Sequence, residues 1–340
     1  MRQTDNPTIH TSVHPAMHPA PHGAVHECRI AWNTLSPPQW EERFARIKRS
    51  NILQSYAYAQ AMCPRLSMRG RWGLIVIDGA EAGLVQILEA DFARKAFHAI
   101  TLDRAPLWFE GFGTIAHYEA FLSALLEEFP KRLGRRYRII PNMQDDAALK
   151  ALMTQKRFRS ASGHYETLWL DLEQSEAALR SALKKNWRGV LSKAEQHSDI
   201  DIRWSFNPDD LQTLLLHYVT DKAQKGYNGA SVKTIRALAR VMLPQQKMLI
   251  GHALKDGQSV ACVLLLLHGR SATYQIGWTG EDGRKLGAQN LLLWRAALTL
   301  KENGISDFDL GGTNDDTAQS VKQFKQGMGA QIVVTGGVYR

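Results

Sequence analysis

A repeated order of helical and β-rich segments constrains the fold of this 340-residue chain more than any other feature. Residues 72–90 predict a β-hairpin, because two β-rich runs flank an Asp-Gly pair. Residues 247–279 predict three antiparallel strands in the second half. In each half, helices precede these strands, and a helix and a further strand follow them. One core rarely supports a chain of this length. We therefore expect an α+β protein with two similar subdomains, residues 28–160 and 161–340, whose mixed, largely antiparallel sheets are flanked by helices.

The first 27 residues differ in composition from the rest of the chain. Histidines recur there at every fourth position, at His10, His14, His18, His22 and His26. On a helix these imidazoles would line one face and could bind a metal, but the prolines among them oppose a helix. The stretch also lacks the basic region and apolar run of a signal peptide. We expect residues 1–27 to form a disordered His/Pro-rich tail.

The charge balance indicates the kind of partner. A net charge of +9 and a pI near 9.5 favour an anionic partner such as RNA, a nucleotide-linked substrate, CoA or a lipid headgroup. The longest apolar run, Val260 to Leu267, suits a buried strand and is too short for a transmembrane segment. The three cysteines form no CxxC motif, so we expect a reducing compartment, the cytoplasm, with no disulfide framework and no metal site.

Residues 175–197 predict one long helix with Ser175 as its N-cap. Arg180, Lys184 and Arg188 step by four along one face, and no carboxylate lies between Arg180 and Ala194. This stripe is either an anion-binding site or a solvated face. The pattern alone leaves both interpretations open.

A glycine turn near the C-terminus raises a more specific question. In "DLGGTNDDTAQSVKQFKQGMG" an apolar lead-in meets a Gly pair, and a Phe-Lys pair follows a polar stretch. Such a turn either reverses the chain or opens it around a ligand. Asp307 and Asp309 alternate before the turn and should share one face of a strand. Asp315 and Asp316 are expected in the turn or as cap residues.

Six segments carry a family likeness, and they are "LQSYAYAQA", "DRAPLWF", "LKKNWRGVLSKAEQ", "ATYQIGWTG", "AQNLLLWRAALTLKENGISDFDLGG" and "VKQFKQGMG". In order and spacing they resemble the FemAB (FemABX) family of aminoacyltransferases, within the GNAT-like acyltransferase superfamily. The resemblance extends over nearly everything from residue 28 onward. In "DRAPLWF", Ala105 replaces the family's glycine. The family fold is two GNAT-like subdomains with a cleft, and the coiled-coil arm of several members has no counterpart insertion here.

The resemblance implies transfer of an aminoacyl group from aminoacyl-tRNA to an amine. In the best-known members the acceptor is the stem peptide of a peptidoglycan precursor. The expected partners are thus aminoacyl-tRNA and an anionic nucleotide- or lipid-linked acceptor, with peripheral association at a membrane surface. No bound cofactor is expected, since aminoacyl-tRNA or acyl-CoA serves as co-substrate.

The resemblance also implies site residues. Lys325 and Phe324 match the family's Phe-Lys pair near the donor. A lysine ammonium would stabilise the negative charge that aminolysis builds on the carbonyl oxygen. Phe324 would stack on the terminal adenosine of a tRNA or, equally, anchor a short helix in the core. Asp309 is expected beside the cleft.

By analogy, acceptor binding falls to Arg188 and Lys185, with Tyr274 and Arg104 as further candidates. The general base is open among Asp103, Tyr274, Asp307, Asp309 and a carboxylate of the substrate.

The donor is the second open question. In "RKLGAQ", Gln289 occupies the position where the GNAT pyrophosphate signature has a small residue, which disfavours a CoA pyrophosphate close to the backbone. An acyl-CoA-dependent N-acyltransferase in polysaccharide or metabolite assembly is the alternative function. A non-enzymatic RNA- or membrane-surface-binding protein is a third.

Overall fold

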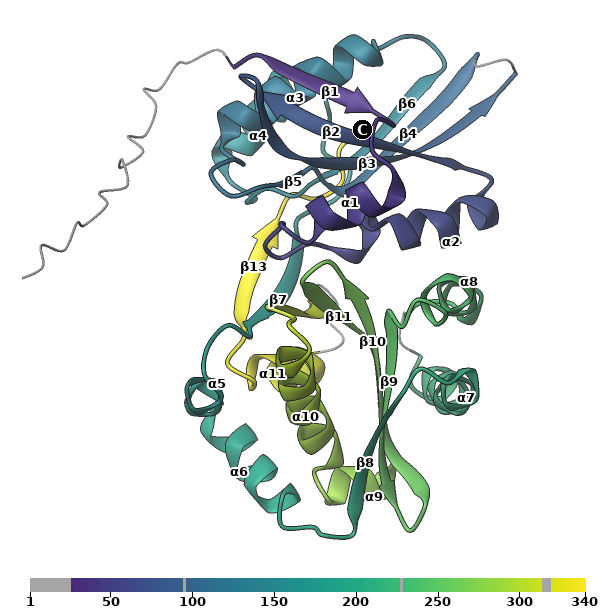
Figure 1. Ribbon diagram of the computed structural model, residues 1–340, viewed down its shortest axis with the longest axis vertical. Coiled ribbons are helices and arrows are strands. Elements are labelled where there is room, and N and C mark those ends of the chain that lie inside the picture. Colours follow the sequence, from purple (N-terminus) through teal and green to yellow (C-terminus); the bar gives the residue numbers. More distant parts are fainter. Residues whose placement is uncertain (1–25, 94–95, 227–228, 314–318) are drawn as a thin grey trace, which may run out of the picture.

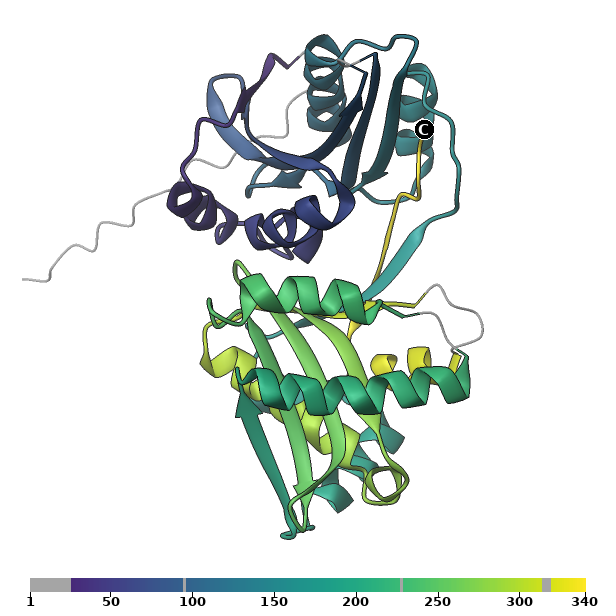
Figure 2. The same ribbon diagram turned by 90° about the vertical axis from the view of Figure 1, so that its right-hand side faces the viewer.

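The chain folds into two lobes, each built on one sheet with helices on both faces (Figure 1, Figure 2). This computed structural model describes residues 26–93, 96–226, 229–313 and 319–340. We call residues 26–160 lobe 1 and residues 161–335 lobe 2. The expected tail, except for its last two residues, lies outside the described residues, as do Asp315 and Asp316. The expected α+β class with two subdomains is confirmed.

Sheet A forms the centre of lobe 1. Its strand order is β1 (Cys28–Trp32), β2 (Arg69–Ile77), β3 (Ala80–Phe92), β4 (Phe97–Ala105) and β6 (Arg135–Pro141), with β5 (Leu107–Trp108) paired to β3. Every pairing is antiparallel except that of β4 with β6. α3 (Ile115–Glu128) and α4 (Ala147–Gln155) cover one face, and α1 (Pro37–Phe44) and α2 (Tyr56–Leu66) cover the face toward lobe 2 (Figure 1). The apolar residues of α3 recur at helical spacing and are fully buried against the sheet, at Tyr118, Phe121, Leu122 and Leu125.

Sheet B forms the centre of lobe 2. Its strand order is β13 (Gln331–Thr335), β7 (Tyr165–Asp171), β12 (Asp307–Gly312), β11 (Ser271–Thr279), β10 (Gln258–His268), β9 (Met248–Lys255) and β8 (Ile200–Ser205). Only β11 and β12 pair in parallel. One face carries α7 (Pro208–Lys225) and α8 (Val232–Met242). The other carries α5 (Glu176–Ala182), α6 (Lys185–Ala194), α10 (Ala288–Glu302) and α11 (Gln319–Gln326), while the short α9 (Glu281–Lys285) precedes α10 (Figure 1).

The clearest β signals in the sequence are confirmed. β2 and β3 form the expected hairpin, and both Asp78 (φ 49°) and Gly79 (φ 82°) have the positive φ angles that a tight two-residue turn requires. β9, β10 and β11 form the expected three-stranded meander. Val260 to Leu267 lies within β10, a central strand of sheet B.

The helix predicted over residues 175–197 is wrong as a single element. Ser175 does cap α5, accepting a hydrogen bond from the backbone N–H of Ala178. The chain becomes extended at Leu183 (φ −60°, ψ 133°), and a second helix, α6, starts at Lys185. The backbone N–H of Lys184 donates to the carbonyl of Gly327 (2.9 Å), a contact 143 residues away in the chain that no local pattern encodes.

The chain returns to lobe 1 after β13. Tyr339 pairs with Ile139 on β6 and with Ser160, and its side chain is buried in the core of lobe 1. The expected second subdomain, residues 161–340, therefore contributes its last residues to the first.

Direct contacts also join the lobes. Ser50 Oγ lies 3.1 Å from His268 Nδ1, and Lys247 Nζ donates to Glu41 (2.7 Å). α7, with 18 residues, is the longest helix among the described residues, and it packs within lobe 2 rather than projecting as an arm. None of the described helices combines the length and apolar character that crossing a bilayer requires.

Candidate active site

β12 places two aspartates where the lobes meet. Asp307 and Asp309 alternate along the strand, and each is 1% exposed. Phe308 and Leu310, between and after them, belong to the apolar core of lobe 2. The backbone N–H of Arg49, in lobe 1, donates to the Asp307 carboxylate (3.3 Å). The aspartate face of β12 is thus directed toward lobe 1.

The glycine turn after β12 lets a lysine approach the backbone. Gly311 has a φ of 81°, which favours glycine. A Cβ at this position would lie 3.2 Å from the carbonyl oxygen of Tyr274 and 3.5 Å from Lys325 Nζ. The turn therefore leaves space for the Lys325 ammonium, which addresses the question that the sequence raised.

Lys325 is a buried cation at this junction. Its side chain extends from α11, is 8% exposed, and donates a hydrogen bond from Nζ to the carbonyl of Gly312 (3.2 Å). Burial lowers its pKa to about 8, and the negative charge of Asp309 partly opposes this shift. At pH 7 the group is predominantly an ammonium. An ammonium in such a water-poor site is suited to stabilise an oxyanion.

Arg104 reaches the same place from lobe 1. Its Nη1 lies 3.8 Å from Asp309 Oδ2, and its guanidinium stacks over the ring of Tyr165 on β7 (4.7 Å). Arg104, Asp309, Lys325 and Tyr274 are therefore brought together from four separate segments. All four were site candidates from the sequence.

The residues that hold Arg104 carry only a weak signal in the amino-acid sequence. Asn51 Nδ2 donates to the carbonyl of Arg104 (2.9 Å), and Gln54 Nε2 donates to that of Asp103 (3.0 Å). Both amides are buried. Ser55, next to them, accepts a hydrogen bond from the backbone N–H of Tyr58 as the N-cap of α2. Gln54 and Ser55 belong to the "LQSYAYAQA" segment, so the polar start of that segment both caps α2 and holds the backbone next to Arg104.

Tyr274 is connected to the start of α10. Gln289 Nε2 donates to the Tyr274 hydroxyl (3.0 Å), and Thr279 Oγ1 donates to Gln289 Oε1 (3.0 Å). The Gln289 side chain thus bridges two groups of β11 beside the helix N-terminus. Close to the same end, a Cβ on Gly287 would come within 2.7 Å of Val190 on α6. This helix end is therefore occupied by protein side chains.

The four candidate bases differ in how their oxygens are used. Asp103 pairs with Arg138, and Asp307 accepts from Arg49 and from Ser306. Burial raises the pKa of Tyr274 to about 12, so this phenol is a poor base at neutral pH.

Asp309 differs from the other three. Its Oδ1 accepts from Thr167 Oγ1 and from the backbone N–H of Gly311 (2.8 Å). Its Oδ2 is buried, accepts no hydrogen bond within the described part of the chain, and lies 3.8 Å from Arg104 Nη1. Asp103 Oδ1 also lacks a hydrogen bond, but Asp309 is the carboxylate whose charge acts on Lys325. Its place beside Lys325 therefore favours Asp309 among the four.

Phe324 packs into lobe 2. Its ring centre lies 6.0 Å from that of Trp187 on α6, and both belong to the apolar core cluster around α10. The contact fits the anchor interpretation for this residue. Stacking on an adenosine stays a prediction.

Lys185 and Arg188 lie on the exposed side of α6, flanking the buried Trp187. In the described part of the chain neither side chain forms a hydrogen bond or ion pair with Lys325 or Arg104, so the structure does not gather them with the junction residues. The sequence predicts a row of arginine and lysine side chains without a carboxylate partner, and this is wrong for Arg180. Its guanidinium donates a hydrogen bond to the Glu195 carboxylate (2.9 Å), one residue beyond the stretch that lacks acidic side chains.

Histidine does not contribute a charge here. His268 is buried near the junction, and its Nε2 lies 2.9 Å from Thr273 Oγ1. Burial lowers its pKa to about 3, so the ring is neutral at pH 7. Within the described ranges no three His, Cys, Asp or Glu side chains gather as a metal site.

Residues 181–326, within lobe 2, match the acetyltransferase (GNAT) domain family. No curated protein sequence matches the chain. The crystal structure of FemX is similar over 91% of this chain and 96% of its own, with a TM-score of 0.75 and 12% identity. A conserved protein of unknown function from Bacteroides thetaiotaomicron covers 91% of this chain and 98% of its own, with a TM-score of 0.56 and 14% identity.

The family match and the fold point to the same class of protein. Residues 181–326 contain an acetyltransferase (GNAT) domain, which supports an acyltransferase activity. The structural likeness to FemX extends through both lobes, so the chain has a FemAB/GNAT-like fold.

Proposed function

We propose that this protein transfers an aminoacyl group from aminoacyl-tRNA to an amine of a peptidoglycan precursor or a related acceptor. The observation that carries the proposal is the buried ammonium of Lys325 beside the glycine turn, with the Asp309 carboxylate next to it. The likeness to FemX supports the choice of donor and acceptor class.

The proposed chemistry is aminolysis of an ester. The acceptor nitrogen attacks the aminoacyl carbonyl carbon, and the carbonyl oxygen becomes negatively charged. The Lys325 ammonium stabilises this charge, which one such donor does by a factor on the order of 10²–10³ in rate. Asp309 takes the proton that the attacking amine must lose. The tetrahedral intermediate then collapses, the bond between the carbonyl carbon and the ribose oxygen breaks, and the departing oxygen takes the proton from Asp309 to become the ribose hydroxyl.

A second candidate donor is acyl-CoA, because residues 181–326 match an acetyltransferase domain. The Gln289 side chain argues against it. It fills the first turn of α10, where a CoA pyrophosphate would have to approach the backbone amides. We therefore place aminoacyl-tRNA first.

The acceptor that fits this proposal is an amine on a nucleotide- or lipid-linked precursor. The positive net charge favours such an anionic molecule, including one presented at a membrane surface. Because aminoacyl-tRNA is a cytoplasmic substrate, we place the reaction in the cytoplasm.

A donor assay tests the proposal. The protein is incubated with a mixture of amine acceptors and with either aminoacyl-tRNA or acetyl-CoA, each radiolabelled in its acyl group. The proposal expects label to move to an amine from tRNA only. Lys322→Met, on the same helix as Lys325, serves as the matched control and should retain transfer, because Lys322 forms its ion pair with Glu166 (2.6 Å) and not with Asp309. Transfer from acetyl-CoA alone would overturn the proposal.

A further inference from the structure

A basic cavity lies at the β6 edge of sheet A. Its volume is about 550 Å³. Seven of its twelve lining residues are lysine or arginine, and none of the twelve has an acidic side chain. The cations come from the loop before β6, from β6 itself, from the turn after α4 and from residue 340. The proposed chemistry at Lys325 does not use any of them.

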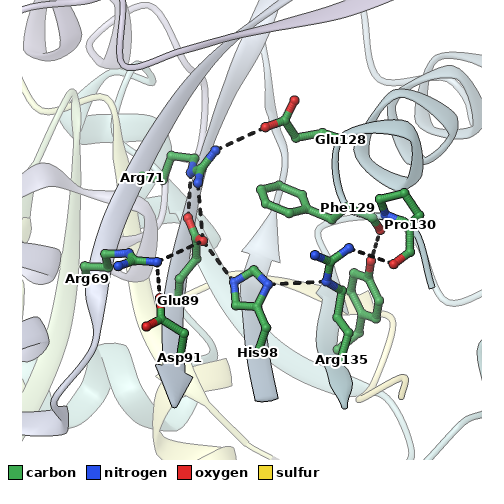
Figure 3. Close-up of polar contacts among 10 residues, drawn as sticks. Arg69, Arg71, Glu89, Asp91, His98, Glu128, Phe129, Pro130 and Arg135 are labelled. Carbon is green, nitrogen blue, oxygen red and sulfur yellow. Dashed lines mark hydrogen bonds and ion pairs between the residues drawn. The ribbon is translucent and has the colours of Figure 1, made fainter. Parts of the chain in front are cut away.

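Several of these cations are held by neutral groups. Lys131 Nζ donates to the carbonyl of Arg157 (2.7 Å). Arg135 donates from Nη1 to the carbonyl of Pro130 (2.7 Å), and its Nε lies 3.3 Å from His98 Nδ1 (Figure 3). Their positive charges are thus fixed in place without being neutralised.

On the opposite side of His98, the Glu89 carboxylate accepts a hydrogen bond from Arg71 Nε, and its other oxygen lies 3.0 Å from His98 Nε2 (Figure 3). That carboxylate is therefore committed to partners outside the cavity.

Other cations have no such support. The side chains of Arg136 and Arg157 are exposed, and neither has a hydrogen-bond or ion-pair partner among the residues that the structure describes. The cations also crowd one another. Burial lowers the pKa of Lys131, and the charge of Arg157 adds to this effect. A bound anion would relieve the repulsion.

The cavity is connected to the candidate active site. Arg136 and Arg138 alternate along β6 and so point to the same face of sheet A. Arg138 lines the cavity and pairs with Asp103, the residue before Arg104, so it links the cavity to the segment that carries Arg104.

We propose that this cavity binds phosphodiester groups of an RNA backbone and so positions the tRNA whose aminoacyl end reaches Lys325. Guanidinium groups match phosphate geometry, and cations spread over four segments suit a row of phosphates better than one compact anion. The choice of RNA rests on the proposed function.

Binding of deacylated tRNA to the full-length protein tests the inference. Its Kd is measured by fluorescence anisotropy at several salt concentrations between about 50 and 200 mM. The test variants are Arg136→Gln and the double variant Arg136→Gln/Arg157→Gln. The matched control is Arg29→Gln, which removes an exposed arginine from β1 at the opposite edge of the same sheet.

We expect the double variant to bind tRNA on the order of 10-fold more weakly at the upper salt concentration. The slope of log affinity against log salt should fall by about 1 for each arginine removed, while the control matches the wild type. An unchanged affinity and slope in the double variant would overturn the inference. The inference would also be overturned if the double variant bound tRNA normally but lost binding to anionic phospholipid vesicles or to inorganic phosphate.

The transfer assay separates this inference from the proposed function. If the double variant uses aminoacyl-tRNA with the wild-type KM, the proposed function holds and the cavity inference fails. If acyl-CoA proves to be the donor but the double variant still loses tRNA binding, the cavity binds RNA as inferred and the proposed function fails.

Discussion

Replacing Lys325 by methionine should separate activity from stability. Burial lowers the pKa of this lysine from 10.5 to about 8. One pKa unit corresponds to about 1.4 kcal/mol, so holding the ammonium inside the folded protein costs about 3 kcal/mol at pH 7. The cost is fully present below about pH 8 and disappears as the pH rises toward 10.5, where the unfolded chain binds the extra proton.

Lys325→Met removes this cost and the oxyanion partner together. We expect the free energy of unfolding at pH 7 to rise by up to about 3 kcal/mol. We also expect the turnover number to fall on the order of 10²–10³. Urea denaturation at pH 7 and at pH 10 measures the first effect, and the difference between variant and wild type should shrink at the higher pH. A variant that is less stable but fully active would refute the reasoning.

Three further outcomes follow from the same contacts. In the wild type we expect kcat to fall above about pH 8, where Lys325 loses its proton. Lys325→Arg keeps its charge at high pH, so this fall should move to higher pH. Identical pH profiles of kcat for the two proteins would contradict a catalytic ammonium. Asp309→Asn removes the charge that supports the ammonium, so an NMR titration should give Lys325 a lower pKa, and an unchanged value would mean that the two groups do not interact. Arg104→Met leaves Asp309 without its nearest arginine and should destabilise the protein by about 2–4 kcal/mol in urea denaturation, whereas a neutral effect would show that this pair is not important for the junction.

Local patterns were sufficient for much of the fold. The Asp78-Gly79 pair specified its hairpin turn, because both residues accept positive φ angles. The apolar run of β10 specified a central strand, since both of its faces are covered by helices. Helices and strands could thus be predicted from the sequence where the backbone preference of the residues and their burial favoured the same structure.

Long-range contacts defeated the same method. The break between α5 and α6 depends on a hydrogen bond from Lys184 to Gly327, and the basic stripe is neutralised at Arg180 by Glu195. The return of Tyr339 to lobe 1 depends on β6 having a free edge. Gly327 and Ile139 lie far outside the window that a periodicity analysis examines. Glu195 lies only 15 residues from Arg180, but on one straight helix the two would be about 22 Å apart, so their pairing depends on the break between α5 and α6.

The candidate site shows the same division. The match to the family's Phe-Lys pair pointed to Lys325, and alternation along the strand placed Asp307 and Asp309 on one face without choosing between them. Convergence of Arg104 on this carboxylate required the packing of two lobes. The amide side chains of Asn51 and Gln54, which hold the backbone around Arg104, are ordinary polar residues in sequence and acquire their role only through burial.

A single-turnover measurement tests the central claim most directly. Excess enzyme is mixed with radiolabelled aminoacyl-tRNA and a saturating amine acceptor, and the rate of peptide-bond formation is followed for the wild type and for Lys325→Met. We predict that the rate constant falls on the order of 10²–10³ while the affinity for tRNA stays the same. Equal rate constants for the two proteins, or no transfer from tRNA by the wild type, would contradict the account.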